Sequence, residues 1–169
     1  ATYGQFMAMT SDFGSAARAP GQHYAYNNEA VVHYGRQMQQ QFFPGQDVPQ
    51  TIFSAFGATL QLQDPVSAFD ESWNGGIAMS SRDLARIGYL VLRDGNWDGQ
   101  QVIPASFVAD LYQNQLGSLP VNPDPAINEF PTRTEMGQCY SHGFWIIHLC
   151  PDKFNGQTSV AGVTLWGAN

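Results

Sequence analysis

Lysine is almost absent from this chain. Lys153 is the only lysine among 169 residues, and seven Lys and Arg together stand against 14 Asp and Glu, for a net charge of −7. A protein that binds nucleic acid or an anionic membrane surface needs a basic patch, which this composition does not provide. No apolar run is long enough to cross a membrane, and no glycine-rich phosphate loop is present. We therefore expect neither nucleic acid nor a membrane as a partner.

Cysteine is also scarce, with only Cys139 and Cys150. The two could form a disulfide or remain as two thiols, and the sequence leaves both open. The four histidines are scattered, and the nearest pair, His142 and His148, has no acidic companion at the spacing of metal ligands. We therefore expect no metal site.

Apolar residues are plentiful, at 43% hydrophobic and 13% aromatic, and 169 residues suffice for one core. Residues 116–141 are rich in Pro, Asn and Gly, which predicts a long surface loop at the rim of a site. The segments 144–149 and 158–166 are β-prone and are separated by a turn region, which is typical of a hairpin.

A Pro-Gly turn signal opens the segment 20–36, and either Asn27 or Asn28 is suited to cap the helix that follows. Tyr26 stands directly before this Asn pair. A phenol at a helix start beside a carboxamide can relay a proton and orient a substrate amide. Tyr26 and Asn28 are therefore candidate site residues, although packing and capping alone would also explain them. The apolar face of the helix is predicted to comprise Val31, Tyr34, Met38 and Phe42.

A second helix is predicted within residues 73–104. Ser80 is suited to cap it, and Asp83 in its first turn favours the positive end of the helix. Gly88 inside the helix costs about 1 kcal/mol relative to Ala, so we expect another backbone to approach it closely. The predicted buried stripe comprises Leu84, Ile87 and Val91, with Leu90 and Leu92 on its flanks. Capping and packing explain this segment better than chemistry does.

Taken in order, these motifs resemble the serine β-lactamase, DD-peptidase and esterase superfamily, and within it the class C-like hydrolases and the nylon-oligomer hydrolase and esterase group. The family pattern has a Pro-Gly turn, a Tyr-x-Asn motif and a Gly-Gly signature that runs on through Ser or Thr, Asp, Ala-Arg and Gly. The matching residues here are Pro20-Gly21, Tyr26 to Asn28, and Gly75 to Gly88. Residues 7–11 are similar to the family's hydrophobic-x-x-Thr-Ser-Gly stretch, with Asp12 where glycine is usual.

The resemblance implies an α+β fold, made of most of a helical region plus a few antiparallel strands at the C-terminal end. Residues 1–169 would then be a single incomplete domain. Within it we expect a mainly helical region over 1–115, a loop over 116–141 and strands of a truncated sheet over 142–169.

The nucleophile of the family is missing. Its members activate a Ser with a Lys one helical turn away, in a Ser-x-x-Lys pair several dozen residues before Tyr-x-Asn. Only 25 residues precede Tyr26, and Cys150 stands three residues before the single Lys153. Ser15 and Arg18 have the spacing, but a guanidinium stays protonated and cannot act as the base. We therefore expect an internal fragment that is inactive by itself.

A third family motif is expected near the C-terminus. Residues 142–145 are similar to the Tyr-Gly-x-x-Trp-Trp strand, and the next strand in the family carries Lys-Thr-Gly, His-x-Gly or a variant that helps form the oxyanion hole. Here 160–162 or 166–168 takes that place, and the candidate substrate-binding residues are Gly162, Trp166 and Gly167. Neither triplet starts with a cation, which argues against recognition of a substrate carboxylate.

The predicted function is that of a fragment of a β-lactamase-related serine hydrolase, which cleaves amide, ester or β-lactam bonds through an acyl-enzyme. Tyr26 would shuttle a proton to the leaving group and Asn28 would hold the substrate amide. The resemblance implies no metal or organic cofactor. The alternative is a non-catalytic binding module, or a degenerate member of the family, that recognises peptidoglycan-like ligands.

Two further expectations concern partners and location. The ligand of the parent protein is a small-molecule amide, ester or β-lactam, and the fragment is expected to form a homo-oligomer that covers its exposed sheet edges. The sequence does not fix the localisation, and a periplasmic or secreted parent is compatible with the family.

Overall fold

The computed structural model of the chain describes residues 1–68, 73, 77–113, 116, 119–131, 140–142, 144–146 and 163–164. The chain forms two compact units, one made of residues 1–34 with 110–168 and the other of residues 35–109. Within the described residues, no helix is both long enough and apolar enough to span a membrane.

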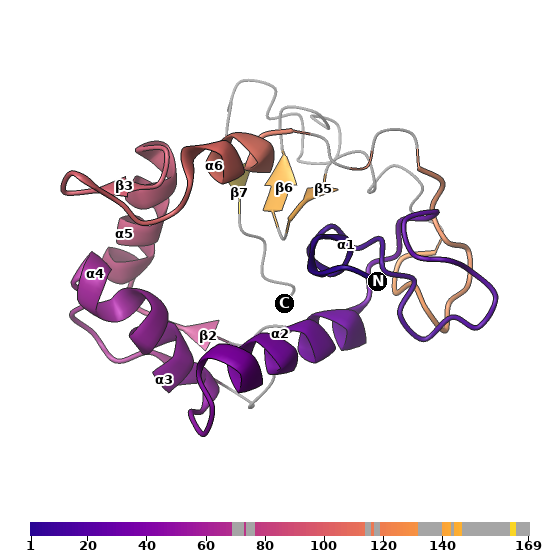
Figure 1. The fold of residues 1–169 in the computed structure, drawn as a ribbon, viewed down its shortest axis with the longest axis horizontal. Coiled ribbons are helices and arrows are strands. Elements are labelled where there is room, and N and C mark those ends of the chain that lie inside the picture. Colours follow the sequence, from indigo (N-terminus) through magenta and orange to yellow (C-terminus); the bar gives the residue numbers. More distant parts are fainter. Residues whose placement is uncertain are drawn as a thin grey trace. The chain divides into compact units, whose positions relative to one another are not determined.

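The first unit combines short helical segments with a small sheet (Figure 1). Helix α1 covers Tyr3–Met7, and α2, which continues into the second unit, covers Asn28–Phe42. Strands β5 (Tyr140–Ser141), β6 (Phe144–Ile146) and β7 (Val163–Thr164) form an antiparallel sheet in that order. Trp145 of β6 is opposite Tyr140 on one side and Thr164 on the other.

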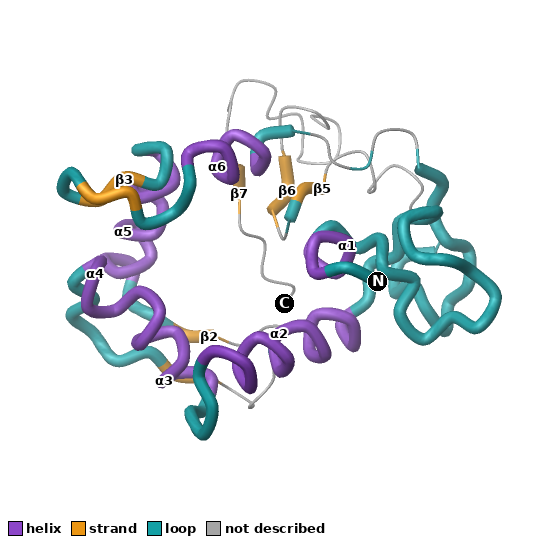
Figure 2. The backbone as a smooth tube through the Cα atoms, in the orientation of Figure 1, coloured by secondary structure: helices purple, strands orange, loops and turns teal. Residues whose placement is uncertain are grey.

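The second unit is mainly helical, with two strand pairs of two residues a strand (Figure 2). Its helices are α3 (Val48–Ile52), a π-helical turn at Phe53–Gly57, α4 (Ala58–Leu60), α5 (Ser81–Leu92) and most of α6 (Ala105–Leu111). Its strands are β1 (Ser67–Ala68) paired with β2 (Ile77–Ala78), and β3 (Asn96–Trp97) paired with β4 (Gln100–Gln101).

The core of the first unit joins segments that are far apart in the sequence. Its buried cluster consists of Ala8, Met9, Tyr24, Leu116 and Tyr140, and Tyr26, Val31, Leu119 and Val121 pack against it. The candidate tyrosine is therefore attached to the core of its unit, because its ring forms part of the packing around that cluster.

Helix α2 begins where the Asn pair predicts. Asn27 is the cap, since its Oδ1 accepts the backbone N–H of Ala30 at 2.9 Å. The predicted apolar face is wrong at its far end, because 56% of Phe42 is exposed. A close contact on this helix is made instead by Gly35, where an added Cβ would collide with the side chain of Trp73. A helical pattern cannot reveal a contact that depends on the absence of a side chain.

Helix α5 also begins as predicted, with Ser80 Oγ accepting the N–H of Asp83 at 3.2 Å. Its predicted buried stripe is only partly correct. Leu90 is buried, but Leu84 is 48% and Leu92 is 74% exposed. The expected close approach at Gly88 is wrong as well, because an added Cβ there would meet no described atom within 4 Å. The spacing of apolar residues predicts which face of the helix is apolar, but not which other elements cover that face.

The predicted α+β class is confirmed: helices predominate, and every described strand pair is antiparallel. The predicted hairpin of residues 144–149 and 158–166 agrees with the β6–β7 pair, as far as those residues are described. The boundaries of the predicted helical, loop and strand regions, and the single incomplete domain, stay predictions.

Candidate functional site

The residues around Tyr26 are fixed from both sides by backbone hydrogen bonds. On one side, the N–H of Ala25 donates to the carbonyl of Met9 at 2.8 Å. On the other side lies the segment 119–131, where Glu129 N–H donates to the carbonyl of Tyr26 at 2.9 Å. Tyr24 also forms a parallel bridge with Val121. A tyrosine held in this way has little backbone freedom, which is what a site residue needs in order to act at a fixed position.

The Tyr26 phenol is half-buried among aromatic rings. Its ring centroid lies 5.2 Å from that of Phe130 and 6.2 Å from that of Tyr140, the latter edge to face. Burial raises the pKa of the Tyr26 phenol, and the negative charge of Glu129 raises it further. The phenol therefore stays protonated at neutral pH.

The two asparagines after Tyr26 have different tasks. Asn27 is buried and structural, because its Oδ1 caps α2 and its Nδ2 donates to the carbonyl of Phe13 at 3.1 Å. Asn28 is only partly buried, and its Nδ2 donates to Oε2 of Glu129 at 2.8 Å. The structure therefore places the candidate residues Tyr26 and Asn28 together, on either side of a buried capping residue.

Glu129 belongs to this cluster and was missed by the sequence reasoning. Its Oε1 accepts the backbone N–H of Asn28, and its Oε2 accepts the side-chain Nδ2 of the same residue, both at 2.8 Å. Glu129 lies 101 residues further along the chain, in a segment predicted only as a loop. An isolated glutamate in such a segment carries no local signal, so nothing short of tertiary structure could have assigned it.

A network of polar side chains, most of them buried, holds the backbone at Tyr26. Asn128 Oδ1 accepts the N–H of Tyr26 at 3.1 Å, and its Nδ2 donates to the carbonyl of Asn122 at 2.8 Å. The Asn122 side chain in turn donates to Asp12 Oδ1 at 2.7 Å. The second oxygen of Asp12 lies 3.4 Å from Nδ1 of His23. Asp12, Asn122 and Asn128 are nearly inaccessible to solvent, and hydrogen bonds between buried polar side chains fix their positions.

Asp12 also accounts for one departure from the family pattern. Its φ of 46° lies in the left-handed region, where glycine is favoured and aspartate is among the better tolerated residues. Asp12 thus has a backbone conformation that glycine favours, and its carboxylate joins the buried network.

Ser141 and His142 form the one described Ser–His contact, at the turn between β5 and β6. Ser141 Oγ lies 3.3 Å from Nδ1 of His142 and donates to the carbonyl of Asp110 at 3.1 Å. Burial lowers the pKa of His142, against the opposing effect of Asp110. Ser141 is fully buried, so this pair is structural and does not replace the missing nucleophile.

The other candidates cannot be placed. Gly162, Trp166 and Gly167, together with the alternative triplets 160–162 and 166–168, lie outside the described residues, as do Cys139 and Cys150. Ser15 is described, and its Oγ accepts the N–H of Ala17 at 3.3 Å, in keeping with a loop residue. No group of three His, Cys, Asp or Glu among the described residues could hold a metal ion.

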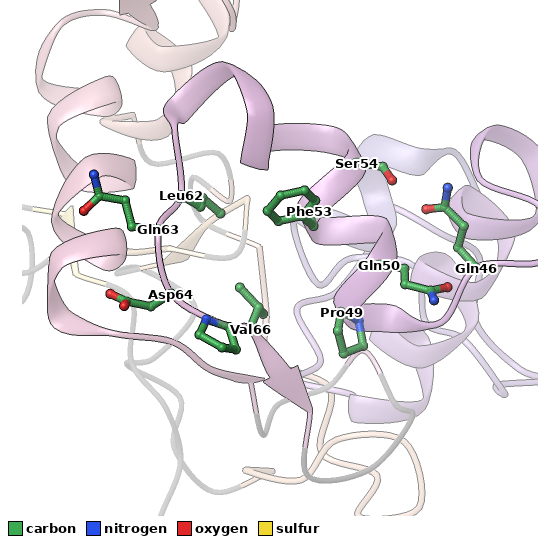
Figure 3. Close-up of a pocket in the computed structure, with 10 residues that line it drawn as sticks. Gln46, Pro49, Gln50, Phe53, Ser54, Leu62, Gln63, Asp64 and Val66 are labelled. Atoms are coloured by element: carbon green, nitrogen blue, oxygen red, sulfur yellow. The ribbon is translucent and has the colours of Figure 1, made fainter.

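A separate pocket of about 590 Å³ lies within the second unit, between the α3 and π-helical segment and the extended chain that leads to β1 (Figure 3). Its apolar wall is formed by Pro49, Phe53, Leu62, Pro65 and Val66, and its polar residues are Gln46, Gln50, Ser54, Gln63 and Asp64. None of the ten is a cation. A volume of this size is typical of small-molecule sites.

The chain is similar in structure to a protein from Bacteroides dorei DSM 17855 whose crystal structure is named "putative beta-lactamase". The TM-score is 0.60 at 17% sequence identity, and the match covers 85% of this chain and 51% of that protein. The chain thus spans about half the length of the solved structure that it matches. No protein-family profile matches the sequence, and no curated protein is significantly similar to it. The fold is therefore a partial β-lactamase-like α+β fold.

Proposed function

We propose that this chain forms the Tyr-x-Asn part of the active site of a β-lactamase-related serine hydrolase, which acts on amide, ester or β-lactam bonds through an acyl-enzyme. The observation that carries the proposal is the arrangement of Tyr26 and Asn28: a protonated phenol and a partly exposed carboxamide, both fixed by the segment 119–131. The β-lactamase-like fold supports it at the level of architecture.

In this function the protonated phenol of Tyr26 donates its proton to the leaving nitrogen or oxygen as the scissile bond breaks. The Asn28 carboxamide holds the substrate amide during this step. Proton donation by a positioned side chain contributes about 10²- to 10⁴-fold to the rate. A serine hydroxyl with a neighbouring lysine must supply the nucleophile, and the 169 residues hold no such pair. By itself the chain is thus proposed to be inactive.

The test begins with the coding sequence on both sides of this segment. An in-frame Ser-x-x-Lys pair several dozen residues before Tyr26 allows the long form to be expressed and assayed with a p-nitroanilide, whose leaving nitrogen must be protonated. We expect Tyr26→Phe to lower its kcat by about 100-fold, in line with the loss of a general acid. A long form with this pair, whose kcat is unchanged by Tyr26→Phe, would disprove the assigned role of Tyr26.

A second candidate function is a binding module for peptidoglycan-like ligands, and the pocket of the second unit favours it. The side-chain oxygens of Gln50 and Gln63 accept hydrogen bonds from Asp47 N–H and from Arg82, so their amide N–H groups remain as donors. Gln46 Oε1 is buried and accepts no hydrogen bond from the described residues. Carboxamides beside an exposed phenyl ring suit an uncharged ligand that is rich in amides.

A further inference from the structure

The Asn28 carboxamide is held in one orientation. Its Nδ2 and its backbone N–H donate to the two oxygens of the Glu129 carboxylate, each at 2.8 Å. A carboxylate only accepts hydrogen bonds, so the end of the carboxamide that faces Glu129 must be the donor end. The opposite end, Oδ1, accepts no hydrogen bond from the described residues. Asn28 is therefore prepared to accept a hydrogen bond from a ligand.

The anion position at the start of α2 is already filled from within the chain. The first N–H groups of a helix carry partial positive charge and commonly bind the carboxylate or phosphate of a ligand. Here Asn27 Oδ1 takes the N–H of Ala30, and the Glu129 carboxylate takes the N–H of Asn28. A substrate carboxylate therefore finds the first of these donors occupied by a group of its own charge.

Within the described part of the chain, no cation is paired with Glu129. Among the described residues, Arg86 forms an ion pair with Asp83 and Nδ1 of His23 lies 3.4 Å from Asp12, and neither contact includes Glu129. A second carboxylate, Glu29, lies in the first turn of α2. A ligand carboxylate brought to Asn28 would meet this negative field at short range, where repulsion is strong.

We propose that Glu129 is a specificity-determining residue, which makes the site select amides and esters without a carboxylate beside the scissile bond and favours those with a neutral or cationic N–H donor. The inference rests on the proposed function of Tyr26 and Asn28. Glu129 is a positioning residue, because it acts through the orientation of Asn28 and through its charge.

Three probes of the same shape test this on the chain as it is: benzamide, which is neutral, benzamidinium, which is cationic, and benzoate, which is anionic. Binding is followed at pH 7 by the NMR shifts of the Asn28 side-chain amide. We expect the Kd of benzoate to exceed those of the other two by about tenfold. Glu129→Gln keeps one acceptor for Asn28 but removes the charge. It should reduce the difference between the Kd of benzoate and those of the other two probes to about threefold or less. Glu29→Gln removes a charge from the same helix turn and should narrow the difference by less than Glu129→Gln does, because Glu129 and not Glu29 is bonded to Asn28.

The outcomes separate the inference from the proposed function. If benzoate binds as tightly as benzamide, and Asn28→Ala abolishes both, the charge selection is wrong while the site stands. If no probe shifts the Asn28 signals, or if Asn28→Ala and Tyr26→Phe leave benzamide binding unchanged, the site itself is wrong. If Glu129→Gln fails to fold, the salt dependence of the unmodified chain is the test. Raising NaCl from about 10 mM to about 0.5 M must then bring the Kd of benzoate closer to those of the other two probes, because salt screens exposed charges. A difference in Kd that does not respond to salt overturns the inference.

Discussion

The Asn122 side chain donates a 2.7 Å hydrogen bond to the Asp12 carboxylate, across 110 residues of sequence and with both side chains buried. Asn122 also accepts the N–H of Asp124 through Oδ1, and its backbone carbonyl accepts the Asn128 side chain. One residue thereby joins the N-terminal loop to the segment that holds Tyr26. The position of the candidate site depends on this connection.

Replacing Asn122 should therefore loosen both segments. We expect Asn122→Ala to lower the free energy of unfolding by about 2–3 kcal/mol, because it leaves a buried carboxylate oxygen without its donor. Urea unfolding measured by circular dichroism gives this value. Gln37→Ala, an exposed position on α2, is the control and should change stability by less than about 0.5 kcal/mol. Equal effects of the two substitutions would contradict the structural role of Asn122.

The local features of this fold could be predicted from the sequence, and the distant ones could not. Ser80 was predicted as one helix cap, and either Asn27 or Asn28 as the other, which the structure assigns to Asn27. Such caps can be predicted because a cap and its N–H partner lie three residues apart and leave a readable pattern. Glu129 carries no such pattern. Its partner Asn28 is 101 residues away, and a single carboxylate in a loop has no period from which pairing could be inferred.

Burial shows the same division. The capping residues correctly predicted where α2 and α5 begin, yet Phe42, Leu84 and Leu92, for which the helical period predicted burial, are exposed. Periodicity identifies an apolar face, but coverage depends on which elements lie against it. The predicted homo-oligomer, the substrate class and the roles of Gly162, Trp166 and Gly167 stay predictions.

Asp83 should make the second unit sensitive to acid. Burial opposes its ionisation, but the N–H groups of Asp64 and Gln63 and the Arg86 guanidinium outweigh burial, so the pKa of Asp83 is lowered from 3.8. Because the pKa of Asp83 is lower in the folded chain than in the unfolded chain, the ionised carboxylate stabilises the fold at pH values above the unfolded pKa. This stabilisation is lost as the pH falls through the folded pKa. We expect Asp83→Asn to unfold at lower urea than the unmodified chain at pH 7, with the difference shrinking below about pH 3.8. Asp98→Asn, at an exposed turn, is the control; a difference independent of pH would refute the assignment.

The Tyr26 phenol should titrate above the usual tyrosine value of 10.0. NMR of ¹³C-labelled tyrosine, assigned with Tyr26→Phe, measures this pKa. Burial is the main cause of the raised pKa, and the charge of Glu129 is the second cause. Glu129→Gln should therefore lower the pKa of Tyr26 relative to the unmodified chain, while the pKa stays above the usual tyrosine value. The folded state favours the neutral phenol, which contributes to the stability of the fold below pH 10. This contribution is lost as the pH rises through the pKa of Tyr26 in the folded chain. An unchanged pKa in Glu129→Gln would show that its carboxylate does not act on the phenol.

The chain alone should resist acylation. Ser141 is buried and donates its proton to a backbone carbonyl, Ser11 is nearly buried, and the sole lysine, Lys153, has no serine three residues before it. We expect the intact mass to stay unchanged after incubation with a fluorophosphonate, while a serine hydrolase in the same tube is labelled completely. A mass increase that disappears when the chain is first denatured would reveal a nucleophile that the sequence and the described residues do not show.

The pocket of the second unit offers a matched pair of phenylalanines for testing the binding-module alternative. Phe53 and Phe56 lie on the same π-helical turn and both are exposed, at 51% and 37%, but only Phe53 lines the pocket. If the pocket binds an amide-rich cell-wall ligand, Phe53→Ala should weaken the binding of a muramoyl dipeptide by about tenfold, because the apolar contact of the ring is lost, whereas Phe56→Ala should not. Calorimetric titration measures both. Equal losses would indicate a general effect on the turn, and absence of binding to the unmodified chain would remove the alternative and leave the hydrolase fragment as the proposed function.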